Sequence, residues 1–348
     1  MQKVKADIHL GRIRRNAEKF LSLTGKPLCA VVKANAYGHG AEEVVASLEP
    51  VVKAFAVALI DEGIAIRGAA CGKEILVFTP PLDEAQAYAI AVNGFAASIP
   101  DLRTARLLSD VCKKYRLPVR AHLKVNTGMN RYGMNISMLG RVCKYLVSDP
   151  FVRVTGLYSH LYTDEYAVAK AQRGLFMQAQ TVCKRYYPEV LCHLSATYGA
   201  TLGKAFAFDM VRIGLGLYGY EPNGRRTLGL EKGMTVYAPV VTSRKFSFGG
   251  AGYGKTFSKS EIEQIGRLSV CRYGYADGFL RQRKNGTVAW ERNVNNLCMD
   301  ACVRKGGEKR PFVPILTDAD ETARLAGTIS YEVLCAATKR AELIYDYE

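Results

Sequence analysis

A lysine that follows a short apolar run is the residue of this 348-residue chain best suited to covalent chemistry. Lys33 follows Val31 and Val32 and precedes a small-residue loop that ends in Gly38-His39-Gly40. The pattern predicts a strand that ends at the lysine, and in parallel α/β folds such strand ends carry catalytic groups. Desolvation there disfavours the charged amine, and a neutral lysine can form a Schiff base. The alternative is an ordinary solvated loop lysine.

Two arginines are further candidates, and Arg131 is expected on the same face as Lys33. Arg131 comes after the strand predicted over Val119–Val125. A guanidinium at that position can hold a carboxylate through two hydrogen bonds or bind a phenolate oxygen, although a surface arginine is the alternative. Arg212 lies in the segment Asp209–Tyr220, which is rich in glycine. Glycine there would let backbone N–H groups approach a phosphate, as at one end of many barrels.

Alternating strand-like and helix-like segments over residues 1–225 must position these groups. Strands are expected at Val51–Ala58, Glu74–Phe78, Gly94–Ile99, Val119–Val125, Val154–His160 and Asp209–Tyr218. Helices are expected at Asp61–Ala69, Asp101–Lys114 and Val168–Tyr187. Repeated β-α units imply a parallel sheet, and about eight of them imply a closed (β/α)8 TIM barrel.

Residues 226–348 have a different sequence pattern, with short β-rich segments separated by Gly and Asn. These segments are Met234–Ser243, Gly266–Tyr273, Thr287–Trp290 and Pro311–Leu316. Helical periodicity is weak until Ser330–Arg340. The pattern predicts a second, mostly antiparallel β domain.

The composition restricts the classes of protein that fit. Hydrophobic residues make up 49% of the chain and charged residues 23%, which is typical of a globular protein. The net charge of +16 comes from scattered Lys and Arg without a nucleic-acid motif, which favours a solvated basic surface over nucleic-acid binding. No apolar run is long enough for a membrane span and no signal peptide is evident, so a cytoplasmic location is expected. Ten cysteines without metal-like spacing favour reduced thiols and no metal site.

Six segments, in the same order along the chain, resemble those of bacterial alanine racemases. They are residues 31–40, 124–133, 193–197, 209–220, 252–257 and 296–300. The resemblance implies that Lys33 carries pyridoxal 5'-phosphate (PLP). It also places further residues around this cofactor: Tyr37, His160, Thr197, Arg212, Gly214, Leu215 and Tyr331. His160 would hold Arg212, and the hydroxyls of Tyr37, Thr197 and Tyr331 would contact the phosphate.

The family arginine that matches Arg212 faces the pyridine nitrogen of PLP. Arginine stays protonated at working pH, so it would discourage protonation of that nitrogen. The ring then becomes a weaker electron sink, which favours fast reprotonation of the substrate and thus racemisation over side reactions. By the same resemblance, Arg131 contacts the cofactor's phenolic oxygen and the substrate carboxylate. Lys124 matches a lysine that is often carbamylated and then positions the arginine.

The resemblance also implies a two-base mechanism. Lys33 would exchange the Cα proton of alanine on one face and Tyr253 on the other, interconverting L- and D-alanine for cell-wall peptidoglycan. In the family, the residues that match Tyr253 and the Met299-Asp300 backbone, which meets the substrate carboxylate, come from the other subunit. A homodimer with shared active sites is therefore expected, with a small-molecule amino acid as substrate.

The chain departs from the family pattern at several positions. Asn126 replaces an aspartate, Ala196 an asparagine and Asn296 an arginine of the substrate corridor, to which Tyr275 and Arg281 also correspond. The C-terminal segment, which includes Leu343, lacks the family's Val-Pro-Arg. Three alternatives follow. The first is a serine racemase of the vancomycin-resistance type. The second is a protein that carries PLP without turnover, although such barrel proteins lack a β domain. The third is a catalytically degenerate paralogue.

Overall fold

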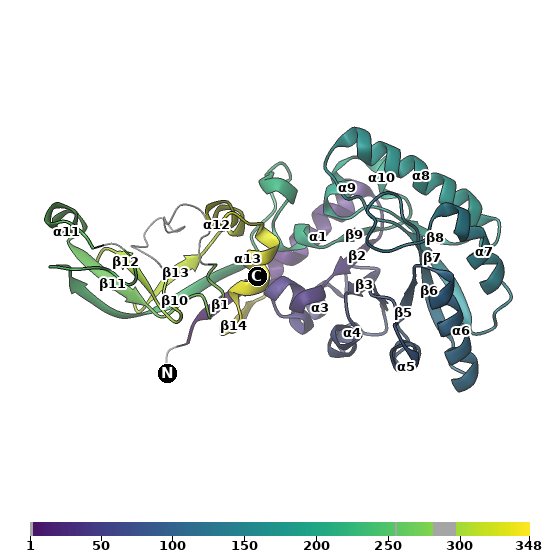
Figure 1. The fold of residues 1–348 in the computed structure, drawn as a ribbon, viewed down its shortest axis with the longest axis horizontal. Helices are drawn as coiled ribbons and strands as arrows, with labels where there is room; N and C mark the ends of the chain where they lie inside the picture. Colours follow the sequence, from purple (N-terminus) through teal and green to yellow (C-terminus); the bar gives the residue numbers. More distant parts are fainter. Residues whose placement is uncertain (1–2, 255, 281–296) are drawn as a thin grey trace. The chain divides into compact units, whose positions relative to one another are not determined.

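Short apolar stretches form eight parallel strands in the computed structural model, which describes residues 3–254, 256–280 and 297–348 (Figure 1). Contacts divide the chain into two units. The barrel unit comprises Arg14–Ala36 and Ala41–Leu217, and the β unit comprises Met1–Ile13, Tyr37–Gly40 and Tyr218–Glu348.

The strands of the barrel unit follow one another around the sheet in chain order, except that the last pairs with the first. They are β2 (Leu28–Val31), β3 (Ala54–Val57), β4 (Glu74–Val77), β5 (Ala96–Ile99), β6 (Val119–Lys124), β7 (Val152–Tyr158), β8 (Leu191–His193) and β9 (Val211–Ile213). β9 pairs with β2, and the Arg212 N–H donates to the Ser195 carbonyl just beyond β8 (2.9 Å). The predicted (β/α)8 barrel is thus confirmed.

Helices surround these strands, which explains why β2, β3 and β5 are buried at every residue (Figure 1). The helices are α1 (Leu10–Thr24), α2 (Lys33–Gly38), α3 (Ala41–Leu48), α4 (Ile60–Ile66), α5 (Glu84–Val92), α6 (Leu102–Tyr115), α7 (Ile136–Leu146), α8 (Tyr166–Lys184), α9 (Thr197–Thr201) and α10 (Lys204–Ala207). Asp83 and Asp101 cap α5 and α6 by accepting backbone N–H bonds. These caps fix where two barrel helices begin.

Two predicted strands are shorter than expected by four residues or more. The N–H groups of Val51 and Val52 donate to the Leu48 carbonyl, so these residues end a helix and the strand starts only at Ala54. The stretch predicted over Asp209–Tyr218 keeps its strand only at β9. It then turns into the 3-10 helix η1 (Leu215–Tyr218). Apolar character alone does not separate a buried strand from a buried helical turn.

The β unit contains a six-stranded sheet, and all but one of its pairings are antiparallel, which confirms the predicted β domain. Its strand order is β12 (Cys302–Lys305), β11 (Arg267–Cys271), β10 (Met234–Lys245), β1 (Lys5–His9) and β14 (Glu342–Asp346), with β13 (Phe312–Leu316) also paired to β10. β1 places the first residues of the chain in this unit, whereas the sequence division at 225 assigned them to the barrel. Leu343 lies in β14 opposite Ala6.

Three helices accompany this sheet: α11 (Lys259–Ile265), α12 (Ala319–Ala326) and α13 (Ser330–Ala337). The sequence predicted only the last of them, with an end near Arg340 that is too late. α11 and α12 have seven and eight residues, too few for periodicity to show, but Ser258 and Asp318 mark their N-termini as caps. The strand predicted at Thr287–Trp290 lies outside the described residues.

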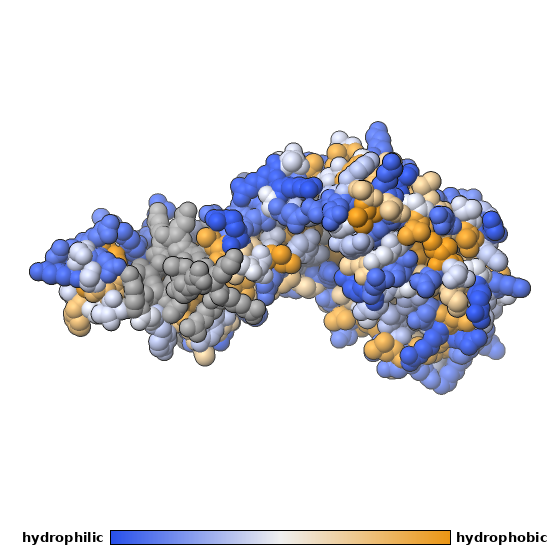
Figure 2. Space-filling model, turned by 45° about the horizontal axis from the view of Figure 1, so that its top comes forward, coloured by the Kyte–Doolittle hydropathy of each residue, from blue (hydrophilic) through white to orange (hydrophobic). Residues whose placement is uncertain are grey.

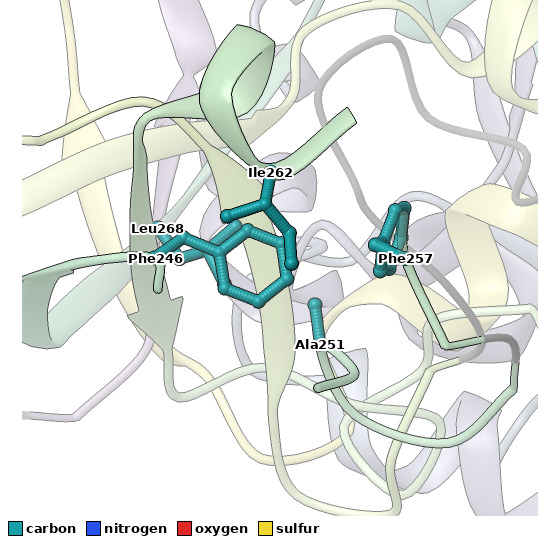
Figure 3. Close-up of a cluster of buried hydrophobic side chains, with 5 residues drawn as sticks. All are labelled: Phe246, Ala251, Phe257, Ile262 and Leu268. Atoms are coloured by element: carbon teal, nitrogen blue, oxygen red, sulfur yellow. The ribbon is translucent and has the colours of Figure 1, made fainter. Parts of the chain in front are cut away.

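A cluster of buried apolar side chains joins β10, α11 and β11 in the β unit (Figure 3). Its members are Phe246, Ala251, Phe257, Ile262 and Leu268. The rings of Phe246 and Phe257 meet edge to face, with centroids 5.6 Å apart. The cluster therefore fixes both ends of the loop between Ala251 and Phe257.

Hydrophilic residues cover much of the face drawn in Figure 2, with apolar residues between them. Among the helices of the described residues, none combines the length and the apolar character that crossing a membrane requires.

Candidate active site

Lys33 lies two residues beyond β2 and begins a turn of unusual handedness. Ala34, Asn35, Ala36 and Tyr37 all have φ between 52° and 54°, so the short helix α2 is a left-handed turn. Each non-glycine residue in this conformation costs roughly 1–2 kcal/mol. Such strain persists only where the surroundings hold the backbone, and it is common at functional sites.

Glu62 of α4 provides one of these holds. Its carboxylate accepts hydrogen bonds from the backbone N–H groups of Ala34 (2.7 Å), Ala58 (2.8 Å) and Leu59 (3.1 Å). The Asn35 side chain accepts a second anchoring bond, from the N–H of Ala41 (2.8 Å). The residue after Lys33 is therefore tied directly to the neighbouring β-α unit.

The loop that carries Arg131 is organised by Asn126. Its side-chain oxygen accepts from the N–H groups of Gly128 (3.0 Å) and Asn130 (3.1 Å), and its amide donates to the Asn130 side chain. Oδ1 can accept both bonds as a carboxylate oxygen would, so the loop forms despite the departure at this position. Arg131 is exposed and lines a cavity of about 550 Å³ together with Pro80 and Pro100.

Arg212 on β9 is only 2% exposed and is held by both of its terminal nitrogens. Nη1 donates to the carbonyl of His193 (2.9 Å) and to its Nδ1 (2.8 Å). Nη2 donates to the carbonyls of Ser159 (2.6 Å) and Leu194 (2.9 Å) and lies 3.4 Å from His160 Nδ1. These bonds leave Nε without a hydrogen-bond partner among the described residues. Burial lowers the pKa of Arg212 to about 10, so it stays protonated near neutral pH.

His193 is the closer of the two histidine partners of Arg212, although its role was not foreseen from the sequence. Its ring stacks on Tyr158, with centroids 5.0 Å apart and planes within 2° of parallel. The Tyr158 hydroxyl in turn lies 2.6 Å from Ser98 Oγ. These contacts fix the orientation of the His193 ring, and therefore that of the guanidinium.

Cationic groups gather at this end of the barrel. Burial is the main reason why the pKa of His160 lies well below its ordinary value, and the charges of Arg212, Lys124, Arg131 and Lys33 lower it further. Burial followed by the charges of Arg212 and Arg131 also holds the pKa of Lys124 well below that of a free lysine. Lys124 lies over the Tyr158 ring, with Nζ 4.2 Å from its centroid. The site therefore favours anions.

Thr197, Gly214 and Leu215 lie where β8 and β9 end. The Thr197 hydroxyl accepts the N–H of Gly216 (3.2 Å), and a Cβ on Gly216 would come within 2.5 Å of the Phe20 ring. Gly214 and Leu215 lead into η1, whose first N–H groups have no intrahelical acceptor. Ala196, the residue before α9, makes no side-chain cap, so the departure at this position removes a possible polar group.

The remaining predicted site residues belong to the β unit. Tyr37 is buried, and its ring centroid lies 4.8 Å from that of Tyr218 and 6.0 Å from that of Tyr331. Burial, and then the charge of a neighbouring group, raises the pKa of both Tyr37 and Tyr331, so both hydroxyls are neutral donors near pH 7.

Tyr253 and Met299-Asp300 are exposed parts of the β unit. Tyr253 is 69% exposed at a loop tip between Gly252 and Gly254, which both have positive φ. The Met299 carbonyl accepts the N–H of Ala276, and Asp300 is bound by Arg340 (2.6 Å). Arg281 and Asn296 lie outside the described residues.

The barrel thus brings one group of predicted residues together: Lys33, Lys124, Arg131, His160 and Arg212. Sequence reasoning missed Glu62 and His193. A glutamate at the third position of a helix is a known capping signal, but its bond to Ala34 depends on the fold. For His193 the usable signal was a histidine at the end of an apolar strand.

These features define a class of protein, a two-unit barrel enzyme with an anion site. They are the parallel (β/α)8 barrel, the lysine beyond β2, the buried arginine on β9 and the β unit on the same chain. Residues 8–222 match the family model described as alanine racemase, N-terminal domain, and residues 233–345 match alanine racemase, C-terminal domain. The chain therefore belongs to the alanine racemase family, whose members are isomerases.

Individual relatives match nearly the whole chain. An alanine racemase from Chlorobaculum tepidum is 30% identical over 98% of this chain and 94% of its own length. One from Lactobacillus delbrueckii subsp. bulgaricus is 31% identical over 98% and 97%. Among solved structures, an alanine racemase from Clostridium difficile 630 superposes with a TM-score of 0.89 at 24% identity, covering 100% of this chain and 97% of that one. The structure from Bartonella henselae, with covalently bound pyridoxal phosphate, gives 0.86 at 24% over 99% and 100%.

Proposed function

We propose that this chain is a PLP-dependent enzyme that interconverts L- and D-alanine, with Lys33 and Tyr253 as opposed bases. Family membership supports the reaction, and the Bartonella henselae relative holds the cofactor covalently. The observation that carries the proposal is the fixed guanidinium of Arg212 in the same barrel as Lys33. Its Nε is left for a ligand that accepts a hydrogen bond, as a pyridine nitrogen does.

The residues present fit the other end of this cofactor as well. Thr197, Gly214 and Leu215 offer a hydroxyl and the N–H groups at the start of η1, a familiar phosphate site of barrels. Tyr37 and Tyr331 add neutral hydroxyl donors. When bound, PLP would withdraw electrons from the amino acid and make its Cα proton removable.

The proposed roles of the protein groups follow from their chemistry. Lys33 would hold the cofactor through its amine, and that amine, when free, would exchange the Cα proton of the amino acid on one face. Tyr253 exchanges it on the opposite face, since a single base would tend to return the proton to the face it left. Arg131 and the Met299-Asp300 backbone hold the substrate carboxylate.

The same proposal includes an assembly and a place in the cell. Tyr253 and Met299-Asp300 are exposed within the β unit, which supports their use at the active site of a partner subunit. The active form is then a homodimer with shared active sites, located in the cytoplasm and supplying D-alanine for peptidoglycan.

The test is racemisation of L-alanine beside L-serine by the purified protein with PLP, followed by chiral chromatography and visible absorbance. We expect alanine to be preferred, with a visible band from lysine-bound cofactor. Lys33→Ala should lose both turnover and the band. Tyr253→Phe should keep the band and lose racemisation. Preference for serine would replace the substrate assignment, and full activity of Tyr253→Phe would refute the two-base assignment.

A further inference from the structure

Hydrogen bonds form an unbroken chain through the interior of the barrel, from the carboxylate at the start of β4 to the guanidinium on β9. Glu74 Oε1 lies 3.1 Å from His122 Nε2, and His122 Nδ1 lies 2.9 Å from His193 Nε2. His193 Nδ1 then lies 2.8 Å from Arg212 Nη1. Both histidines and Arg212 are no more than 2% exposed. Their packing is tight, because a Cβ on Gly156 would lie 2.4 Å from the His122 ring.

The direction of every bond in this chain follows from the arginine. A guanidinium only donates, so His193 Nδ1 must accept and its proton must be on Nε2. That proton is donated to His122 Nδ1, which leaves the His122 proton on Nε2, facing Glu74. These hydrogen bonds are therefore all satisfied only when both histidines are neutral and carry their proton on Nε2, with a Glu74 oxygen as the last acceptor.

The two ends of this series of hydrogen bonds carry opposite charges, a guanidinium at one end and a carboxylate at the other. A buried cation normally has an anionic partner, but among the described residues the hydrogen-bond partners of Arg212 are carbonyls and imidazoles. Glu74 supplies the carboxylate at the far end of the chain. Burial alone would raise the pKa of Glu74, but the hydrogen bond from His122, with the charges of Arg120 and Lys53, lowers it below its ordinary value. Glu74 therefore stays ionised near neutral pH.

We propose that Glu74 and His122 are positioning residues that hold Arg212 through His193, with Glu74 as its remote counter-ion. The ionised carboxylate makes His122 a better acceptor, which makes His193 a better acceptor for Arg212. The guanidinium is thereby fixed with Nε toward its ligand. The part of this inference that concerns cofactor binding rests on the proposed function, whereas the hydrogen-bond chain itself does not.

A pH dependence follows from the tautomers. If either histidine gains a proton, a nitrogen that must accept becomes a donor, and the bond to Arg212 is lost. The charged groups that face the chain are Arg120 and Lys53 near Glu74, and Lys124 near His193. Burial, and then the charges of Arg212 and Lys124, hold the pKa of His193 well below its ordinary value. The chain is therefore expected to hold near neutral pH and to break on acidification.

The first test needs no cofactor. Nitrogen NMR of the full-length chain, labelled in histidine, should show His122 and His193 as neutral Nε2–H tautomers near neutral pH. Glu74→Gln, which keeps an acceptor oxygen and removes the charge, should move both signals. An Nδ1–H or doubly protonated His193 in the unaltered chain would overturn the proposal whether or not the protein binds PLP.

The second test measures the cofactor site. In His122→Asn the asparagine can still accept a hydrogen bond from His193 but cannot reach Glu74. This variant therefore keeps the bond to His193 and removes the connection to the carboxylate. We expect about 10-fold weaker PLP binding, as for loss of one hydrogen bond to a charged group, and a shifted pH profile of the visible band. Glu74→Gln should also weaken PLP binding and should shift the pH profile of the visible band in the same direction. The control is His9→Asn, which breaks a surface His–Asp pair in the β unit and should change neither. Unaltered binding and pH profile in both test variants would overturn the proposal.

Discussion

The bond between Glu62 and the Ala34 N–H should control the geometry of Lys33, and Glu62→Ala tests this directly. The turn from Ala34 to Tyr37 stores strain of about 4–8 kcal/mol, at 1–2 kcal/mol for each left-handed residue. The bond to Ala34 crosses from α4 to this turn and is charge-assisted, so its loss should cost about 1.5 kcal/mol. That energy corresponds to roughly a 10-fold shift between the observed turn and a relaxed one.

We expect Glu62→Ala to lower kcat about 10-fold and to leave the KM for alanine nearly unchanged, because substrate contacts are not touched. Loss of the bonds to Ala58 and Leu59 removes a helix cap and should lower the free energy of unfolding by about 1 kcal/mol more. Glu62→Gln keeps one acceptor oxygen and should be intermediate.

Asp61→Ala is the matched control, because Asp61 is the exposed neighbour of Glu62 in the first turn of α4. Hydrogen exchange of the Ala34 amide gives a local readout, and its protection should fall in Glu62→Ala and not in the control. Unchanged kcat together with lost protection at Ala34 would show that the turn does not position Lys33, and the reasoning would be wrong.

Three further predictions concern buried groups of the barrel unit. Gly156→Ala should displace the His122 ring, lower the free energy of unfolding by about 2 kcal/mol in urea titration and weaken PLP binding; wild-type values for both would contradict the packing. Burial alone would raise the pKa of Asp149, but hydrogen bonds from Ser109, the Phe151 and Val152 N–H groups and Lys113 lower it. The stabilisation by Asp149 is therefore present above its unfolded pKa and is lost as the pH falls through its folded pKa. Between roughly pH 6 and pH 3, the free energy of unfolding should fall by about 2 kcal/mol less in Asp149→Asn than in the unaltered protein. Burial, and then the charges of Arg212 and Arg131, lower the pKa of Lys124, which raises the neutral, reactive fraction of its amine, so intact mass measured in bicarbonate should show an acid-labile carbon dioxide adduct that Lys124→Arg lacks.

The sequence predicted those features that depend on neighbours along the chain. An apolar run followed by small residues located Lys33 beyond a strand, and repeated β-α units predicted the barrel. The β unit was also predicted, although its first strand was not. β1 (Lys5–His9) pairs with residues more than 220 positions away, and no local pattern shows such a partner. The short helices α11 and α12 were missed because seven or eight residues give too little periodicity.

The left-handed turn after Lys33 shows a different limit. Ala34 and Ala36 are good formers of right-handed helix, so local propensity favours the opposite hand to the one observed. The observed hand is accompanied by bonds from Glu62 and Asn35, which meet the turn only once the barrel has formed. A conflict between local preference and observed structure is expected where a fold holds a functional group in place.

Arg212 shows the same limit of local sequence information. Its own segment identified it as a candidate, because Gly214 and Gly216 follow it and the segment resembles that of the family. Its hydrogen-bond partners come from strand β8 and from the residues that follow β7 and β8. Its remote carboxylate, Glu74, is 138 positions away and appears in the sequence as a polar residue at the start of a strand. Because a buried charge must be compensated somewhere, the presence of a partner for Arg212 was predictable, but only the register of the barrel strands identifies it as Glu74.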